Sequence, residues 1–540
     1  MFIVNQPWKD AHSERETEKP DQRIPWNATS LPPIQACSSD DSMRKNRKKA
    51  GTDATRANPG RTQPSPIDCR QHALSAGVAR AVIQGSAVLQ HERNTCRPAS
   101  PLHAVQAILA GLVVLVTANT LAADDHNWPN WRGPFLNGSA SPHAQPPLTW
   151  SEGCAGSWKL DLPGEGSATP VVWDGRIFVL SAEQTDRKAE RVPETHPDAK
   201  TNPPEHYYRF LVTAVDSHSG QLIWQKSVTE QVPHEGRHPT HTYAAGSPVT
   251  DGQRLYVSFG SRGIFCLSLD GDLLWQRDLG DMRTRYGWGE AVTPALSGDR
   301  LIINWDAEEG SFVTALDTRT GDELWRRSRP TEPTSWNTPL VIQSADRTLA
   351  VVNGTGRARA YDVSSGEVVW ECGGQTTNAI PTPLAYQDLV VCMSGYRGSA
   401  AIGIPLDSVG DLTGSNQIRW KHSRGTPYVA SPTAAGQHLF FTAGRSGLLT
   451  VLDLKTGATI SERLRLNGIE DCYASPLAAA GHVFICGRNG TTVVIRDRPP
   501  FETVARNQLT GKLDASPVAV GSQLFLRSWS TLYGFSSAEQ

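Results

Sequence analysis

The chain has 540 residues, is rich in glycine (47), proline (37) and tryptophan (16), and carries a formal net charge of −2. This length allows either two or more ordinary domains or one large all-β domain, and the composition favours many short strands joined by tight turns. Nothing after residue 123 has the basic character of a nucleic-acid-binding surface, so we expect no nucleic acid among the partners.

Residues 1–100 are predicted to be disordered, because they are rich in Ser, Pro, Arg and Asp and show no sustained hydrophobic period. Their basic run MRKNRKK is interpreted as part of a solvated tail and not as a binding patch. Whether the native product contains these residues at all depends on where translation starts.

Residues 101–123 have the features of a signal peptide. The run AVQAILAGLVVLVTA at 104–118 forms an apolar core, and the residues at 120–122 form a small-residue cleavage site. Because secretory signals stand at the N-terminus, two interpretations are open. Either translation starts downstream at a non-Met codon, with Val82 and Leu102 as candidates, or the segment is an uncleaved signal anchor.

We favour the downstream start, because 15 apolar residues are short for a membrane span, which needs about 20. The mature chain is then expected to start near residues 122–124 and to be periplasmic or secreted. It would contact a membrane only if the apolar segment stayed uncleaved. Residues 124–147 are interpreted as an N-terminal arm that precedes the repeats.

An Asp, a Gly and a Trp recur in one frame along the chain. ALDTRTGDELW at 315–325 matches AVDSHSGQLIW at 214–224 and AYDVSSGEVVW at 360–370, and a shortened copy, SLDGDLLW, ends at Trp275. The Asp is expected to cap a tight turn, the Gly to permit it, and the Trp to pack against the neighbouring repeat. The tryptophans assigned this docking role are Trp158, Trp224, Trp275, Trp325, Trp370 and Trp420.

A second signature, a Ser or Thr followed by Pro and an apolar run, alternates with the first. It occurs eight times, with the prolines at 170, 248, 294, 339, 383, 432, 476 and 517. Successive prolines are separated by about 41 to 49 residues, except for a longer first interval. Each unit is predicted to contain four short strands, as in the unit that starts at Ser247. Four-stranded antiparallel units at this period predict an all-β fold, an eight-bladed β-propeller, over residues 148–540.

The eighth unit ends before its outer strand. The stretch PLTWSEGCAGSWKLDLPG at 147–164 precedes the first repeat and carries Trp158 in the style of an outer strand. We therefore expect this N-terminal strand to complete the last blade beside residues 524–535, which closes the ring and removes its exposed edges.

These repeats resemble those of pyrroloquinoline-quinone (PQQ) type propellers over residues 148–540, and NWPNWRGP at 127–134 is similar to the opening of secreted members found in bacteria such as planctomycetes. The resemblance implies an eight-bladed ring with tryptophan-docking motifs. It leaves the activity open, because the superfamily includes quinone-dependent dehydrogenases, a lipoprotein scaffold for outer-membrane protein assembly, and sensor domains attached to kinases.

Several motifs that would choose among these functions are absent from the sequence. It has no adjacent Cys pair, no haem-attachment motif, no lipid-bearing Cys after the cleavage region and no kinase signature. We therefore expect a non-catalytic scaffold that binds other exported or envelope proteins, or a small anionic ligand. The alternative is a PQQ-dependent oxidoreductase, for which the resemblance implies PQQ with calcium.

Propeller geometry predicts where a site would lie. Alternate turns of a four-stranded meander lie on opposite faces, so the turn before the first strand and the turn after the second share one face, which we call the ring mouth. Basic, acidic, amide and aromatic side chains there suit an anionic ligand, although the acids could simply neutralise the arginines. The candidates are Arg262, Trp288, Glu290, Trp336, Asn337, Asn378, Arg397, Tyr428, Arg445, Asp471, Tyr473, Arg488 and Asp514.

One loop carries His234, His238 and His241 together with Glu235, residue types that bind zinc or copper. The loop is interrupted by Pro and Gly, so the four side chains do not share a regular face. We therefore expect ordinary loop histidines and no metal site.

Overall fold

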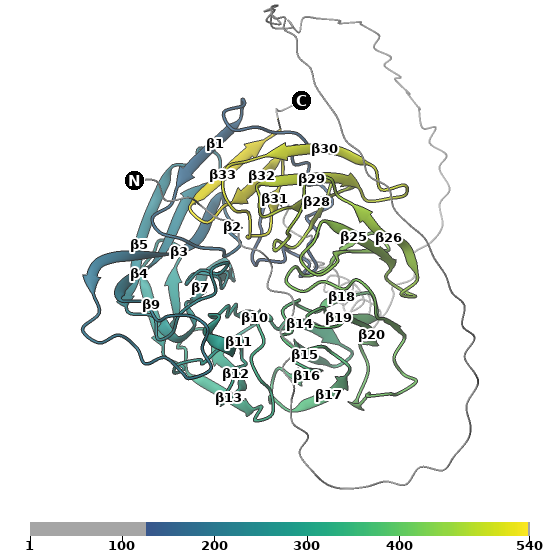
Figure 1. Cartoon of the computed structure of the whole chain (residues 1–540), viewed down its shortest axis with the longest axis horizontal. Coiled ribbons are helices and arrows are strands. Elements are labelled where there is room, and N and C mark those ends of the chain that lie inside the picture. The colour runs from purple at the N-terminus through teal and green to yellow at the C-terminus, as the bar shows by residue number, and fades with distance from the viewer. Residues whose placement is uncertain (1–125, 538–540) are drawn as a thin grey trace, which may run out of the picture. The chain divides into compact units, whose positions relative to one another are not determined.

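The structure is a computed structural model that describes residues 126–537. The predictions for residues 1–100 and 101–123, and for the start of the mature chain, lie outside this range. The described residues form eight sheets arranged as a ring (Figure 1), and each sheet contains a four-stranded antiparallel blade. No helix in residues 126–537 has the length and apolar character of a membrane span. The predicted eight-bladed all-β propeller is confirmed.

The first four blades follow the chain from the inside of the ring outward. Blade 1 contains β2 (Val171–Trp173), β3 (Arg176–Lys188), β4 (His206–Asp216) and β5 (Leu222–Gln231); blade 2 contains β6 (Val249–Thr250), β7 (Arg254–Ser258), β8 (Ile264–Ser268) and β9 (Leu273–Arg277). Blade 3 contains β10 (Ala295–Ser297), β11 (Arg300–Trp305), β12 (Phe312–Asp317) and β13 (Glu323–Ser328); blade 4 contains β14 (Leu340–Ser344), β15 (Arg347–Asn353), β16 (Arg357–Asp362) and β17 (Val368–Gly373). Two short 3₁₀ turns, η1 (Gly260–Arg262) and η2 (Arg285–Gly287), precede β8 and β10.

The remaining blades repeat this order. Blade 5 contains β18 (Leu384–Tyr386), β19 (Leu389–Ser394), β20 (Ala400–Pro405) and β22 (Trp420–His422); blade 6 contains β23 (Thr433–Ala435), β24 (His438–Thr442), β25 (Leu448–Asp453) and β26 (Thr459–Arg465). Blade 7 contains β27 (Leu477–Ala479), β28 (His482–Cys486), β29 (Thr491–Arg496) and β30 (Thr503–Gln508); blade 8 contains β31 (Val518–Val520), β32 (Gln523–Arg527), β33 (Thr531–Ser536) and β1 (Ser157–Asp161).

The last blade closes as the sequence predicts. β1 pairs antiparallel with β33, and Trp158 lies opposite Gly534. The outer strand of blade 8 therefore comes from the start of the propeller, so the ring is held shut by backbone hydrogen bonds between segments far apart in the sequence.

The Asp-Gly-Trp frame joins each blade to the next. The Trp275 indole N–H donates to the Thr318 carbonyl at 3.0 Å, and a Cβ added to Gly321 would lie 2.6 Å from the Trp275 ring. Only glycine fits there, because Gly321 also has a φ of +72°. The same contacts join Trp158 to Ser217 and Gly220, Trp224 to Leu269 and Gly271, Trp325 to Val363 and Gly366, and Trp420 to Leu454 and Gly457.

Trp370 differs from this docking pattern. It is fully buried, but its indole N–H has no hydrogen-bond partner among the described residues. Blade 5 has a long insertion in place of the Asp-Gly turn, and β21 (Gly410–Asp411) from this insertion pairs in parallel with β17 of blade 4. An added strand thus replaces the tryptophan hydrogen bond at this junction.

The Ser/Thr-Pro signature forms a belt of seven hydrogen bonds around the inside of the ring, which the sequence did not indicate. The Thr169 N–H donates to the Ser247 hydroxyl at 2.9 Å, and the Ser247 N–H donates to the Thr293 hydroxyl at 3.0 Å. Further links of this kind run from Thr338 to Thr382, Ser431, Ser475 and Ser516. The Ser516 N–H donates back to the Thr169 hydroxyl at 3.0 Å. Seven of the eight hydroxyls, all but that of Thr338, therefore satisfy a buried backbone N–H of the neighbouring blade.

The N-terminal arm, described from residue 126 to 147, runs across the inner strands of the ring on the side of the belt away from the ring mouth. It exchanges backbone hydrogen bonds with blade 1 at Val172 and blade 2 at Thr250, and then with blade 6 at Ala434, blade 7 at Ala478 and blade 8 at Gly521. The bonds of Trp128 and Pro129 explain the NWPNWRGP stretch as a structural segment that joins the arm to blades 1 and 2.

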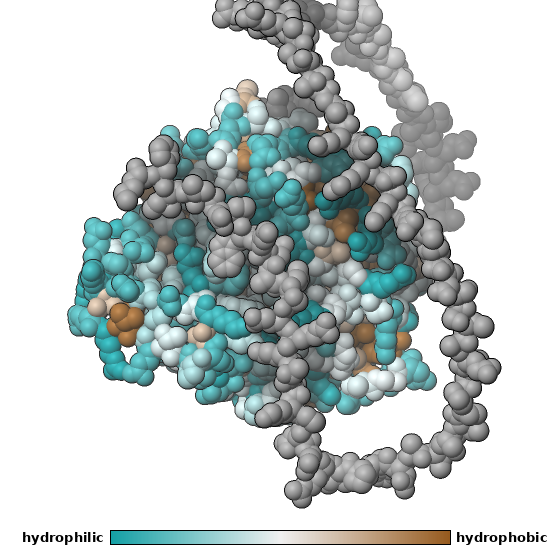
Figure 2. Space-filling model, in the orientation of Figure 1, coloured by the Kyte–Doolittle hydropathy of each residue, from teal (hydrophilic) through white to brown (hydrophobic). Residues whose placement is uncertain are grey.

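The described surface seen in Figure 2 is mostly hydrophilic, with scattered hydrophobic patches. The exposed apolar side chains include Leu222, Ile223, Leu273 and Leu274, which start the outer strands of blades 1 and 2. A concave site is therefore a better candidate for function than this outer surface.

Candidate functional site

A cavity of about 230 Å3 opens at the ring mouth, and every blade contributes to its wall. The loops that precede the inner strands meet here, as turn alternation predicts. They supply Ser167, Ala245, Trp288, Ala291, Trp336, Ile380, Tyr428, Val429, Tyr473 and Asp514, while His238, Thr240 and His241 come from the loop between blades 1 and 2 and Arg445 from a turn of blade 6.

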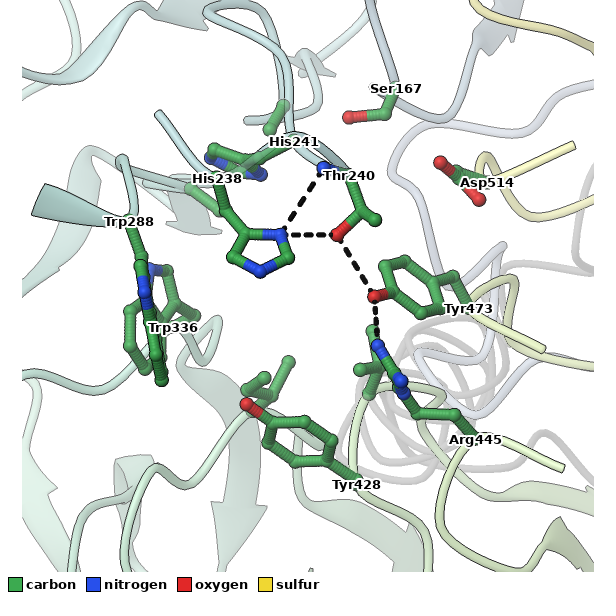
Figure 3. Close-up of a pocket in the computed structure, with 14 residues that line it drawn as sticks. Ser167, His238, Thr240, His241, Trp288, Trp336, Tyr428, Arg445, Tyr473 and Asp514 are labelled. Carbon is green, nitrogen blue, oxygen red and sulfur yellow. Dashed lines mark hydrogen bonds between the residues drawn. The ribbon is translucent and has the colours of Figure 1, made fainter. Parts of the chain in front are cut away.

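Two tryptophans form one side of the cavity (Figure 3). The rings of Trp288 and Trp336 stack with centroids 6.3 Å apart, and the Trp336 indole N–H donates to the Gly289 carbonyl at 2.7 Å. Gly289 has a φ of +95°, and a Cβ there would lie 2.5 Å from the His241 ring. The sequence RYGWGE thus holds Trp288 in place through a backbone conformation that glycine permits.

A hydrogen-bonded chain faces the tryptophans across the cavity (Figure 3). The Arg445 guanidinium donates to the Tyr473 hydroxyl oxygen at 2.7 Å, and the Tyr473 and Thr240 hydroxyls lie 3.0 Å apart. Thr240 contacts His238 Nδ1 through its hydroxyl at 2.8 Å and its backbone N–H at 3.2 Å. Because that N–H must donate, His238 Nδ1 accepts, and the ring carries its proton on Nε2.

The charge state of His238 follows from its surroundings. Burial, followed by the charges of Arg445 and Arg488, lowers the pKa of His238. The ring is therefore neutral at neutral pH, and Figure 3 shows its second nitrogen directed into the cavity. This arrangement offers an incoming ligand one fixed N–H donor.

The charges of the cavity are unevenly balanced. Asp514 lines the wall, but its carboxylate accepts two bonds from Arg488, at 2.6 and 2.9 Å, and one from the Trp529 indole at 2.7 Å. Arg445 is 3.9 Å from its acidic neighbour Asp471 and is 45% exposed. The charge of Arg445 is therefore less neutralised by a nearby carboxylate than that of Arg488.

The structure places the other predicted residues outside this wall. Arg262 donates to the Val232 carbonyl and pairs with Asp281, the Asn337 amide is bonded to Asn353, and Arg397 lies over the Tyr396 ring. Asn378 is buried and accepts a bond from Arg285, while Asp471 and Arg488 support the wall from behind. These interactions position loops around the cavity, and sequence spacing alone could not separate them from the lining residues.

Glu235 and Glu290 are largely buried outside the cavity wall, and no sequence pattern indicated their burial. Both Glu290 oxygens accept bonds from Ser261, and Glu235 accepts bonds from Thr284. Burial raises the pKa of Glu235 to about 7 and that of Glu290 to about 8. His234 Nδ1 lies 3.2 Å from the Glu290 carboxyl, so the acids and the histidine loop form one cluster.

The three loop histidines each use a ring nitrogen within the protein. His234 bonds to the Met282 carbonyl at 2.9 Å, His241 to the Glu290 carbonyl at 2.8 Å, and His238 to Thr240. Burial lowers the pKa of His241 to about 4, which keeps that ring neutral. Within residues 126–537, no three His, Cys, Asp or Glu side chains are grouped to hold a metal ion.

The residues of the mouth do not fit a quinone bound together with calcium. Calcium takes about six to eight oxygen ligands, including carboxylates with free lone pairs. The oxygens of Asp514 already accept bonds from Arg488 and Trp529, and Glu290 lies outside the cavity, bonded to Ser261. The one carboxylate of the described wall, that of Asp514, is therefore already occupied by protein donors.

The comparisons with known proteins agree with the architecture. A family model described as outer membrane protein assembly factor BamB matches residues 209–463. Among solved structures, a europium-containing methanol dehydrogenase aligns with a TM-score of 0.53 and 10% identity over 76% of this chain and 91% of that chain. A quinohemoprotein alcohol dehydrogenase from Comamonas testosteroni aligns with a TM-score of 0.52 and 12% identity over 80% and 85%.

BamB from Moraxella catarrhalis aligns with a TM-score of 0.45 and 14% identity over 66% of this chain and 98% of that chain. No curated protein sequence matches this chain. At identities this low, the two dehydrogenase structures establish a shared fold and no activity. By its repeats and its ring of eight four-stranded blades, the chain has the fold of the PQQ-like β-propellers, and the family model matches its residues 209–463.

Proposed function

We propose that this protein is a non-catalytic binding propeller whose ring-mouth cavity holds one small, flat, anionic molecule. One observation carries the proposal: the stacked Trp288 and Trp336 face the weakly offset charge of Arg445 across a single cavity (Figure 3). An aromatic wall favours a flat apolar body, and a guanidinium favours a carboxylate.

The remaining polar groups support the same ligand class. Burial raises the pKa of Tyr428 to about 12, so its hydroxyl keeps its proton and can donate, as can Nε2 of the neutral His238. The Tyr428 and His238 donors and the Arg445 cation thus lie in a mostly apolar cavity, which is the usual composition of a small-molecule site. A volume of about 230 Å3 limits the occupant to a small molecule or one side chain of a partner protein.

Export is the second part of the proposal. The apolar run at 104–118 and its small-residue cleavage site support a periplasmic or secreted protein, whose ligand would come from that compartment or from an envelope protein. N-terminal sequencing of the native protein should find a start near residues 122–124. A cytoplasmic product that retains residues 1–100 would contradict it.

Calorimetric titration with indole-3-acetate and the neutral indole-3-acetamide tests the ligand class. We expect the acid to bind at least tenfold more tightly than the amide, because only the acid pairs with Arg445. Arg445→Gln should abolish this preference, and Trp336→Leu should weaken both probes. Arg319→Gln is the matched control, because Arg319 is 69% exposed in a turn of blade 3 away from the mouth. Equal binding of the acid and the amide to the unmodified protein would refute the proposed class.

The oxidoreductase alternative is tested separately by dye-linked alcohol oxidation after incubation with PQQ and calcium. We expect no turnover above that of a heat-denatured sample. Turnover that disappears in the Trp336→Leu variant would overturn the non-catalytic proposal in favour of a quinoprotein.

A further inference from the structure

A second cavity, of about 220 Å3, lies across the belt from the ring mouth, between the N-terminal arm and the inner parts of blades 2 to 5. The arm contributes Pro129, Asn130, Trp131, Arg132, Pro134 and Leu136. The opposite wall is mainly apolar and includes Val249, Ala295, Leu296, Leu340 and Val341. None of these residues takes part in the ring-mouth site.

The path of the arm explains why a cavity remains here. In blades 1, 2, 6 and 7 the arm bonds to the residue three positions after the belt Ser or Thr, for example Val172 and Ala434. The equivalent residues in blades 3 and 4 are Leu296 and Val341, and both line the cavity. The arm thus crosses from blade 2 to blade 6 and leaves the inner strands of blades 3 and 4 uncovered in the described structure.

Arg132 is the charged group in this wall. It is only 3% exposed, and its Nη2 donates to the Pro432 carbonyl and, at 3.2 Å, to the Thr433 hydroxyl. Burial lowers its pKa to about 9, with no acid contributing to the shift. Within residues 126–537 no carboxylate pairs with Arg132, although a buried cation without an anion is costly.

We propose that this cavity binds a small carboxylic acid with an apolar body, its carboxylate pairing with Arg132 and its body packing between Trp131 and the inner strands of blades 3 and 4. Such a ligand supplies the missing negative charge and fills apolar space. A neutral ligand would leave the guanidinium uncompensated, so the site discriminates by charge as well as by shape.

Titration of the full-length protein with octanoate and octanamide tests this site. We expect octanoate to bind and raise the unfolding temperature, and octanamide to bind at least tenfold more weakly. Arg132→Gln should remove the preference for the acid. Val341→Phe should abolish octanoate binding by filling the cavity, while Arg132 and the hydrogen bonds of the arm stay intact. This variant therefore tests the site even if Arg132→Gln does not fold.

The Arg445→Gln variant separates the two sites. Octanoate should bind to it with unchanged affinity, because Arg445 lines the ring mouth, whereas Arg132 belongs to the arm and lines the second cavity. The proposal is overturned if octanoate fails to bind, if octanamide binds equally well, if Val341→Phe leaves the affinity unchanged, or if Arg445→Gln removes the binding.

Discussion

Replacing Gly321 with alanine probes the tryptophan docking that holds the ring together. The residue has a φ of +72°, and a new Cβ would lie 2.6 Å from the Trp275 ring. The left-handed backbone alone costs an alanine about 1 to 2 kcal/mol, and displacing a packed ring adds about 1 to 3 kcal/mol. We therefore expect a loss of about 2 to 5 kcal/mol in the free energy of unfolding, measured by denaturant titration.

Gly298→Ala in the same blade is the matched control. Gly298 has a φ of +58°, but nothing lies within 4 Å of the position that its new Cβ would take, so only the backbone cost of about 1 to 2 kcal/mol applies. The difference between the two variants measures the displaced Trp275 contact. Equal losses for the two variants would refute the docking role of Trp275.

The buried acids, the tryptophans and the belt give three further predictions. Burial raises the folded-state pKa of Glu235 to about 7 and of Glu290 to about 8, so the folded protein should lose stability as pH rises from about 6.5 to 8. In thermal unfolding, the Glu290→Gln variant should show a smaller loss over this pH range. An unchanged slope of stability against pH would contradict this prediction. Below pH 6.5 the lowered pKa of His241 opposes the trend, because the folded state then resists protonation. Trp275→Phe should lower the free energy of unfolding by about 1 kcal/mol more than Trp370→Phe, because only Trp275 loses an indole hydrogen bond. Equal losses of the two variants in denaturant titration would count against this prediction. Ser516→Ala should lower the free energy of unfolding by about 1 to 3 kcal/mol, because it leaves the buried Ser475 N–H without its acceptor. Ser516→Thr should retain this hydrogen bond. Equal losses of stability for the two substitutions would argue against a stabilising role of the belt.

The fold could be predicted because repetition amplifies weak local signals. Eight Ser/Thr-Pro copies and the recurring Asp-Gly-Trp frame indicated the number of blades, and the unpaired final repeat predicted that Trp158 joins the last one. Turn alternation also predicted that Trp288, Trp336, Tyr428, Tyr473 and Asp514 would approach one another. These inferences need only chain order and strand direction.

Other features depend on contacts between residues far apart in the sequence. The bond from Arg488 to Asp514, which occupies the acid of the wall, could not be distinguished by spacing from a free site carboxylate. The burial of Glu235 and Glu290 leaves no periodic signal in the sequence, and the insertion that adds β21 beside Trp370 interrupts the repeat. The belt was hidden because its hydroxyls bond to neighbouring blades and not within their own repeat.

A crystal structure of the protein soaked with indole-3-acetate tests the proposed ring-mouth site most directly. We predict density for the indole against Trp288 and Trp336 and for the carboxylate within hydrogen-bonding distance of Arg445, with a lower occupancy of the same site in the Arg445→Gln variant. An empty ring mouth in crystals of the unmodified protein, or density with the carboxylate directed away from Arg445, would contradict the proposed function.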